Sequence, residues 1–83
     1  MSVDVLEKLY KRFVEIYGII YDSENDVLGY RFMVGYYDRM LKKSDDFKTM
    51  VSEFCNYRQD VISSDREAAA FMFAFTEFYR IED

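Results

Sequence analysis

The chain has 83 residues, a net charge of −5 at neutral pH and no histidine. This length fits one small domain spanning residues 1–83. The acidic balance argues against direct nucleic-acid binding through phosphates. A single cysteine excludes an intrachain disulfide, and no apolar run is long enough to cross a bilayer, so we expect a cytoplasmic protein that makes no membrane contact. Aromatic residues make up 19% of the chain, more than a small core needs, so we expect some of them at the surface.

The first predicted element is an amphipathic helix over residues 3–21. Its apolar residues recur every three or four positions, which is typical of one buried helix face. Gly18 is a candidate for ending this helix early. The predicted core face comprises Val3, Leu6, Leu9, Tyr10, Phe13, Ile16, Tyr17 and Ile20.

The segment YDSENDVLGY, residues 21–30, resembles a calcium loop in its acids. Asp22, Glu24 and Asp26 have the spacing of the first three ligands of such a loop. The turn-forming glycine and the final bidentate acid are missing, because Val27 and Met33 stand at those positions. We therefore interpret the segment as a polar junction between helices.

A second helix is predicted over residues 24–43, preceded by Ser23 as a capping residue and closed by a cluster of cations. The alternative is an α+β fold, in which residues 18–34 form a β-hairpin of β-branched and aromatic residues.

Serine residues mark the next two helix starts. Ser44 precedes two acids and predicts an N-cap. Ser64 and Glu67 have the spacing of a capping box, which predicts a fourth helix over residues 65–80. The predicted core face of the third helix comprises Phe47, Met50, Val51, Phe54, Tyr57, Val61 and Ile62, and that of the fourth comprises Ala68, Phe71, Met72, Phe75, Phe78 and Tyr79. Four helices with short connections predict an all-α fold, a small antiparallel four-helix bundle.

No pattern in the sequence indicates catalysis. Cys55 has no histidine to activate it and is interpreted as a small buried thiol. The neighbouring carboxylates of Asp45 and Asp46 point about 100° apart on a helix, so they do not converge on one substrate. The chain also lacks a phosphate-binding glycine loop. We predict a non-enzyme with no cofactor and no metal site.

The second helix carries two apolar stripes. One, assigned to the core, comprises Val27, Tyr30, Val34, Tyr37 and Leu41. The other comprises Leu28, Phe32 and Tyr36, with Arg39 adjoining. A helix that is apolar on most of its circumference is either buried or shared between a core and a partner, and we favour the shared interpretation.

Two further residues are predicted to bind a partner. Phe73 falls opposite the core face of the fourth helix, beside Ala69 and Ala70. Arg58 lies within the predicted apolar face of the third helix, where it either extends to solvent, forms an ion pair or contacts a partner.

These features predict a small acidic protein that binds another protein without catalysis, as an inhibitor or modulator. In composition alone it resembles the small host-takeover and anti-defence proteins of phages and mobile elements. That resemblance implies a partner with a basic surface, such as the groove of a nucleic-acid enzyme, facing acids that include Asp45 and Asp46. The alternatives are a structural subunit of a complex or homodimer, and a small-molecule sensor with an aromatic pocket.

Overall fold

The computed structural model describes residues 2–22, 29–59 and 61–79. These residues form four helices and no strand: α1 (Val3–Asp22), α2 (Tyr30–Lys43), α3 (Asp45–Tyr57) and α4 (Asp65–Phe78). The predicted all-α fold of four packed helices is confirmed. The alternative hairpin over residues 18–34 is wrong in its described part, because residues 18–22 and 30–34 are helical.

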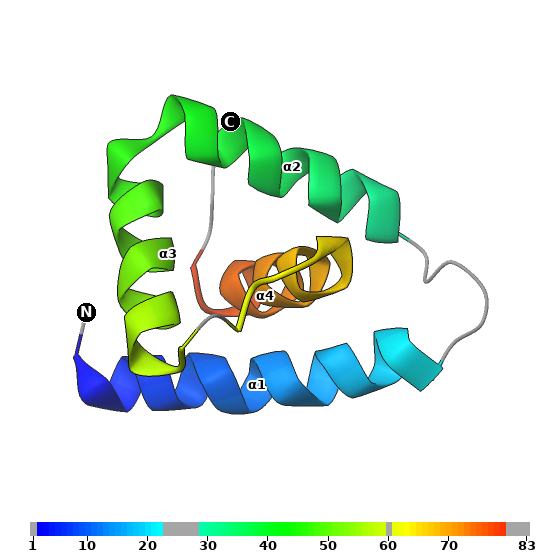
Figure 1. Cartoon of the computed structure of the whole chain (residues 1–83), viewed down its shortest axis with the longest axis horizontal. Helices are drawn as coiled ribbons and strands as arrows, with labels where there is room; N and C mark the ends of the chain where they lie inside the picture. Colours follow the sequence, from blue (N-terminus) through cyan, green and yellow to red (C-terminus); the bar gives the residue numbers. More distant parts are fainter. Residues whose placement is uncertain (1, 23–28, 60, 80–83) are drawn as a thin grey trace.

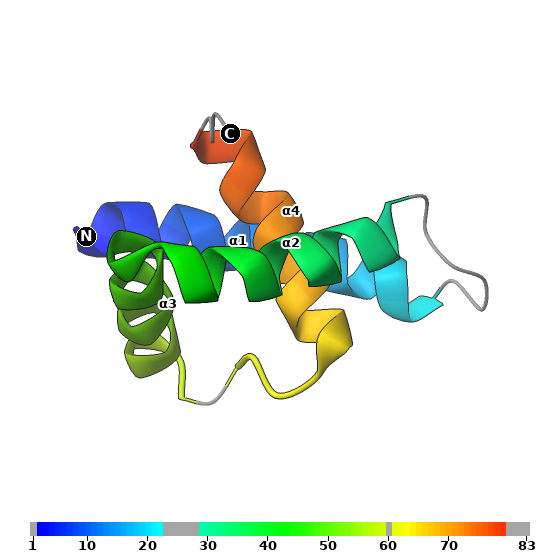
Figure 2. The ribbon, with the colours of Figure 1, turned by 90° about the horizontal axis from the view of Figure 1, so that it is seen from above.

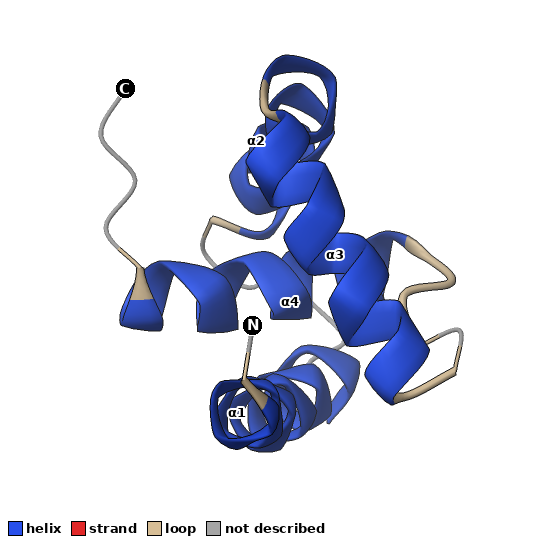
Figure 3. Cartoon of the chain, turned by 90° about the vertical axis from the view of Figure 1, so that its left-hand side faces the viewer, coloured by secondary structure: helices blue, strands red, loops and turns tan. Residues whose placement is uncertain are grey.

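Helix α4 lies at the centre of the arrangement. α1 and α2 run in opposite directions on two sides of the molecule, and α4 crosses between them (Figures 1 and 2). α3 follows α2 in the chain and runs toward the beginning of α1, so that it closes one end of the fold (Figures 1 and 3). Because α4 packs against α1 and α2 on different sides, it is the element around which the core is built.

This central position corrects the predicted faces of α4. Ala69 and Ala70, expected opposite the core together with Phe73, are fully buried. Phe78, expected in the core, is 49% exposed near the end of the helix. The prediction assumed one buried face, whereas α4 has a neighbouring helix on two sides, and its small alanine side chains allow close approach. The buried residues of α4 are Ala68, Ala69, Ala70, Phe71, Met72, Ala74 and Phe75.

A cluster of aromatic rings from α2, α3 and α4 fills the centre. The Phe71 ring centroid lies 4.8 Å from that of Phe54, 6.1 Å from that of Phe47 and 6.2 Å from that of Tyr37. Most of these rings meet edge to face, the arrangement favoured by their quadrupoles. Burial raises the pKa of Tyr37 to about 12, because the phenolate would be poorly solvated there.

The start of α3 confirms the capping prediction. The Phe47 backbone N–H donates to the Ser44 hydroxyl, 3.1 Å away. Helix α4 begins at Asp65 as predicted, but the Ser64 side chain makes no capping bond to the backbone and instead donates to the Glu67 carboxylate. The capping-box residues are therefore paired with each other.

Three predicted boundaries are corrected or untested. α1 continues through Gly18 to Asp22, and α3 ends at Tyr57, so Val61 and Ile62 pack against the core from outside a helix. The predicted start of α2 at residue 24 lies outside the described residues. The described part begins at Gly29, whose φ of 90° is the left-handed conformation that favours glycine.

The core face of α1 is largely as predicted, with one exception. Val3, the first residue of the helix, is 64% exposed. In the described part of the chain, no helix combines the length and apolarity needed to cross a membrane.

Candidate interaction surface

Helix α2 divides its apolar residues between two faces, as the sequence predicts. Tyr37 is buried, and Tyr30, Val34 and Leu41 pack against the core beside it, whereas Val27 lies outside the described residues. On the other face the Phe32 side chain is 62% exposed. The helix therefore packs against the fold with one stripe, while on the other face Phe32 is exposed and Tyr36 is half-buried against the core.

We name Phe32, Tyr36 and Arg39 the outer stripe. The ring centroids of Phe32 and Tyr36 are 5.9 Å apart. The Arg39 guanidinium carbon lies 6.0 Å from the first ring centroid and 5.7 Å from the second, within the range of a cation–π interaction. The structure thus brings together three of the predicted partner-binding residues. The fourth member of the predicted stripe, Leu28, lies outside the described residues.

Gly35 lies beneath the Arg39 side chain. A Cβ atom at this position would stand 3.6 Å from Arg39 Nη1, an ordinary van der Waals contact. The guanidinium therefore lies near Gly35 and at a similar distance from both aromatic rings of the outer stripe. This arrangement holds a cation beside two rings, one exposed and one half-buried, before any partner binds.

The charge of α2 is opposite to that of the whole chain. Its residues include four cations and one acid, a net charge of +3, while the whole chain carries −5. Among the four described helices α2 alone has a net positive charge. Arg39, Lys42 and Lys43 are all exposed. The outer stripe is consequently a basic and aromatic surface on an acidic protein.

Arg58 does not lie within a helix, which corrects the prediction that placed it on the apolar face of α3. It is the C-cap of α3, and its guanidinium carbon lies 4.2 Å from the Tyr57 ring centroid and 4.8 Å from that of Tyr10. Its side chain also donates to the Tyr57 carbonyl oxygen, 3.3 Å away. Arg58 thereby ties the end of α3 to α1, and its role in partner binding stays a prediction.

Phe73 lines a cleft between α1 and α4 that Ile16, Ile19 and Ile20 also line, with a volume of about 280 Å³. It is half-buried, and its ring lies beside Gly29. Phe73 is therefore less exposed than Phe32, and its neighbours differ from those of the outer stripe. Its partner-binding role stays a prediction.

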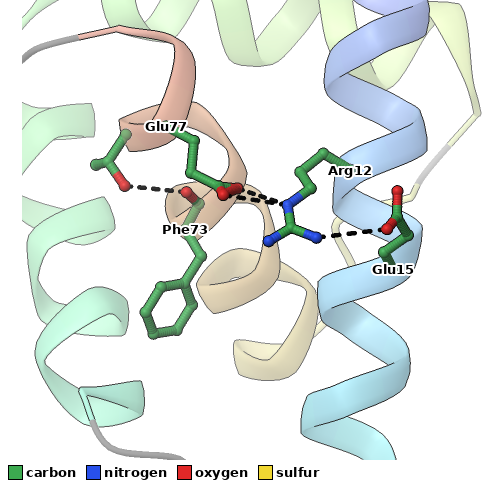
Figure 4. A network of polar contacts seen from close by, with 5 residues as sticks. Arg12, Glu15, Phe73 and Glu77 are labelled. Carbon is green, nitrogen blue, oxygen red and sulfur yellow. Dashed lines mark hydrogen bonds and ion pairs between the residues drawn. The ribbon is translucent and has the colours of Figure 1, made fainter.

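An ion pair closes one side of this cleft. Arg12 Nε donates to Glu77 Oε2 at 2.7 Å, and Arg12 Nη1 lies 3.4 Å from Glu15 Oε2 (Figure 4). The hydrogen bond to Glu77 raises the pKa of Arg12. All three side chains are substantially exposed, so solvent screens these charges and we expect the ion pair to contribute little to stability.

Four aromatic side chains form a row of stacked rings along α1. Three of them were predicted on the core face, but their stacking was not predicted. The ring centroids of Tyr10, Phe13, Tyr17 and Tyr21 follow one another at 6.1, 6.2 and 5.9 Å. Arg66 contacts the last ring, 5.4 Å from its centroid. Burial and the nearby Glu67 carboxylate raise the pKa of Tyr17. The repeat of aromatic residues at three- and four-residue spacing was the available signal. The structure employs this row mainly in packing.

The prediction that the protein is not an enzyme stays a prediction. Cys55 is half-buried against the core. Residues 2–22, 29–59 and 61–79 contain no cluster of three acidic or cysteine side chains arranged to hold a metal ion. Comparison of the chain with protein-family models, curated proteins and solved structures finds no match.

Proposed function

We propose that this protein acts by binding another protein through the outer stripe of α2, as a non-catalytic inhibitor or modulator. The exposure of Phe32 beside Tyr36 and Arg39, on a helix already fastened through Tyr37, carries the proposal. Aromatic residues and arginine are the types most enriched among the residues that dominate binding energy at interfaces.

The outer stripe is suited to binding because little of it has to reorganise. Its side chains contact one another along a helix, so their rotamers are already restricted before association. Preorganisation lowers the entropy lost on binding. Covering the Phe32 ring would contribute roughly 1–2 kcal/mol from apolar burial.

Apolar exposure on α1 favours a second candidate, a structural subunit of a larger assembly. Val14, Ile19 and Tyr21 are exposed on that helix, in addition to Phe32 on α2. A subunit would depend on its partners for stability, so its melting temperature would rise with protein concentration or with partner added. An interaction protein would melt at a temperature independent of its own concentration.

The test compares partner capture by the wild type, Phe32→Asp and Val3→Asp. The two variants add the same charge at side chains of nearly equal exposure, 62% and 64%, on different helices. We expect Phe32→Asp to lose the captured protein while circular dichroism shows unchanged helicity, and Val3→Asp to retain it. Equal capture by all three proteins would refute the assignment of the outer stripe.

A further inference from the structure

We propose that the surface bound by the outer stripe is acidic: a protein segment with apolar side chains flanked by Asp or Glu. This inference rests on the proposed function and specifies the partner's chemistry. The outer stripe lies on α2, whereas the basic partner predicted from the sequence would face the exposed acids Asp45 and Asp46 of α3. The argument is one of charge complementarity.

The cations of α2 are placed to meet carboxylates beside the two rings. Lys43 follows Arg39 by four residues and therefore lies on the same helix face. Within the described residues Arg39 contacts the two rings and pairs with no carboxylate. A guanidinium has five N–H donors, and stacking against rings leaves its edge available to bind a carboxylate in bidentate fashion. The outer stripe thus offers an apolar contact and an anion contact side by side.

Met33 and Met40 extend the apolar side of this surface. Both are partly buried and pack against the core, and they lie on the flank of α2 that faces away from Arg31 and Lys42. Methionine side chains adapt to partners of different shape. The opposite flank carries Arg31, Asp38 and Lys42, with a net charge of +1. The surface is therefore apolar along one flank and basic on balance along the other, which matches an amphipathic acidic segment.

A second copy of the chain is a poor occupant. A symmetric dimer through the outer stripe would place α2 against α2, because a two-fold interface uses the same patch on both subunits. Each helix carries a net charge of +3, so the two faces would repel each other. An acidic partner instead gains from the same charges.

Anionic lipid and nucleic acid share the charge of the proposed partner but fit the protein less well. The whole chain carries −5, so a bilayer surface or a nucleic acid, each much larger than α2, would also meet the acidic remainder of the molecule. A protein segment of the size of α2 would face mainly α2, whose net charge is +3. Both polyanions serve as outcomes of the test.

The experiment measures binding of a synthetic amphipathic helical peptide with Leu on one face and Glu beside it, by fluorescence anisotropy. The comparison peptide has Lys at every Glu position. We expect the acidic peptide to bind, with affinity falling as salt is raised, and the basic peptide to bind at least about tenfold more weakly. Arg39→Glu should lower the affinity for the acidic peptide at least about tenfold. Lys11→Glu, the same charge change at an exposed position of α1, should change this affinity by no more than about twofold.

Several results would overturn the inference. These are equal or tighter binding of the basic peptide, no binding of either peptide at about 1 mM, and an equal effect of the two charge reversals. If phosphatidylserine vesicles or single-stranded DNA bind more tightly than the acidic peptide, and Arg39→Glu abolishes that binding, the outer stripe would instead be a lipid-binding or nucleic-acid-binding surface. A dimer in light scattering that Phe32→Asp disrupts would identify a second copy instead. If Phe32→Asp abolishes partner capture while the acidic peptide does not bind, the proposed function stands and only the partner's chemistry is wrong.

Discussion

Replacing Phe71 by alanine tests the arrangement of the core most directly. Phe71 is fully buried in the central helix, and its ring contacts those of Tyr37, Phe47, Phe54 and Phe75. Truncating such a side chain removes apolar burial and leaves a cavity, which costs about 3–5 kcal/mol. A domain of this length is expected to have a total stability of only about 4–12 kcal/mol, so the variant should lose about a quarter of it or more.

Urea unfolding followed by circular dichroism measures this loss, with Phe32→Ala as the control. The control removes the same ring from a position that is 62% exposed, so its free energy of unfolding should change by no more than about 0.5 kcal/mol. The slope of the transition should be the same in the three proteins, because the surface exposed on unfolding is similar. A loss below about 1 kcal/mol for Phe71→Ala, or equal losses for the two variants, would refute the central placement of α4.

Three further predictions concern local structure, each checked on a purified variant. Gly29→Ala should lower the free energy of unfolding by about 1–2 kcal/mol, because the φ of 90° at this position is left-handed. Gly18→Ala should raise it by about 0.5–1 kcal/mol, because Gly18 lies inside α1 and no neighbouring atom is within 4 Å of the added Cβ. Chemical unfolding that ranks the two variants in the opposite order would contradict this prediction. Ser44→Ala should cost about 1 kcal/mol in thermal unfolding through the lost bond to the Phe47 N–H, and an unchanged melting temperature would contradict it. The pKa of Tyr37 is raised to about 12, so the folded state favours its neutral form. Its stabilising contribution is therefore complete below about pH 10 and is lost as the pH rises toward 12. When the pH is raised, tyrosinate absorbance should show a late phase that is absent from Tyr37→Phe.

Local signals in the sequence were sufficient for the helices and for most of their starts. Ser44 followed by acids predicts the N-cap that the structure contains, and the capping-box spacing places the start of α4 at Asp65. Such signals depend on a few neighbouring residues, so they can be recognised without knowing the fold. The end of α3 was predicted less well. Val61 and Ile62 continue the helical spacing of apolar residues, but they pack against the core from outside a helix.

The arrangement of the helices depends on long-range contacts that periodicity does not encode. A helical wheel assigns one buried face to each helix, and α4 has buried residues on more than one side. Its run of three alanines, Ala68–Ala70, was the available clue, because small side chains in a helix allow neighbours to approach on several sides. The position of Arg58 likewise followed from where α3 ends, and its contacts with Tyr10 and Tyr57 could not be read from spacing.

The central position of α4 gives the outer stripe its significance. α1 and α2 lie on different sides of α4, so each has a face directed away from it (Figure 1). On α1 the exposed positions carry charges of both signs at Glu7, Lys8 and Lys11, together with the apolar side chains of Val14 and Ile19. On α2 the exposed face instead carries Phe32 beside a cation. What distinguishes this position is the cation beside the ring, because binding an acidic partner would use both the ring and the charge.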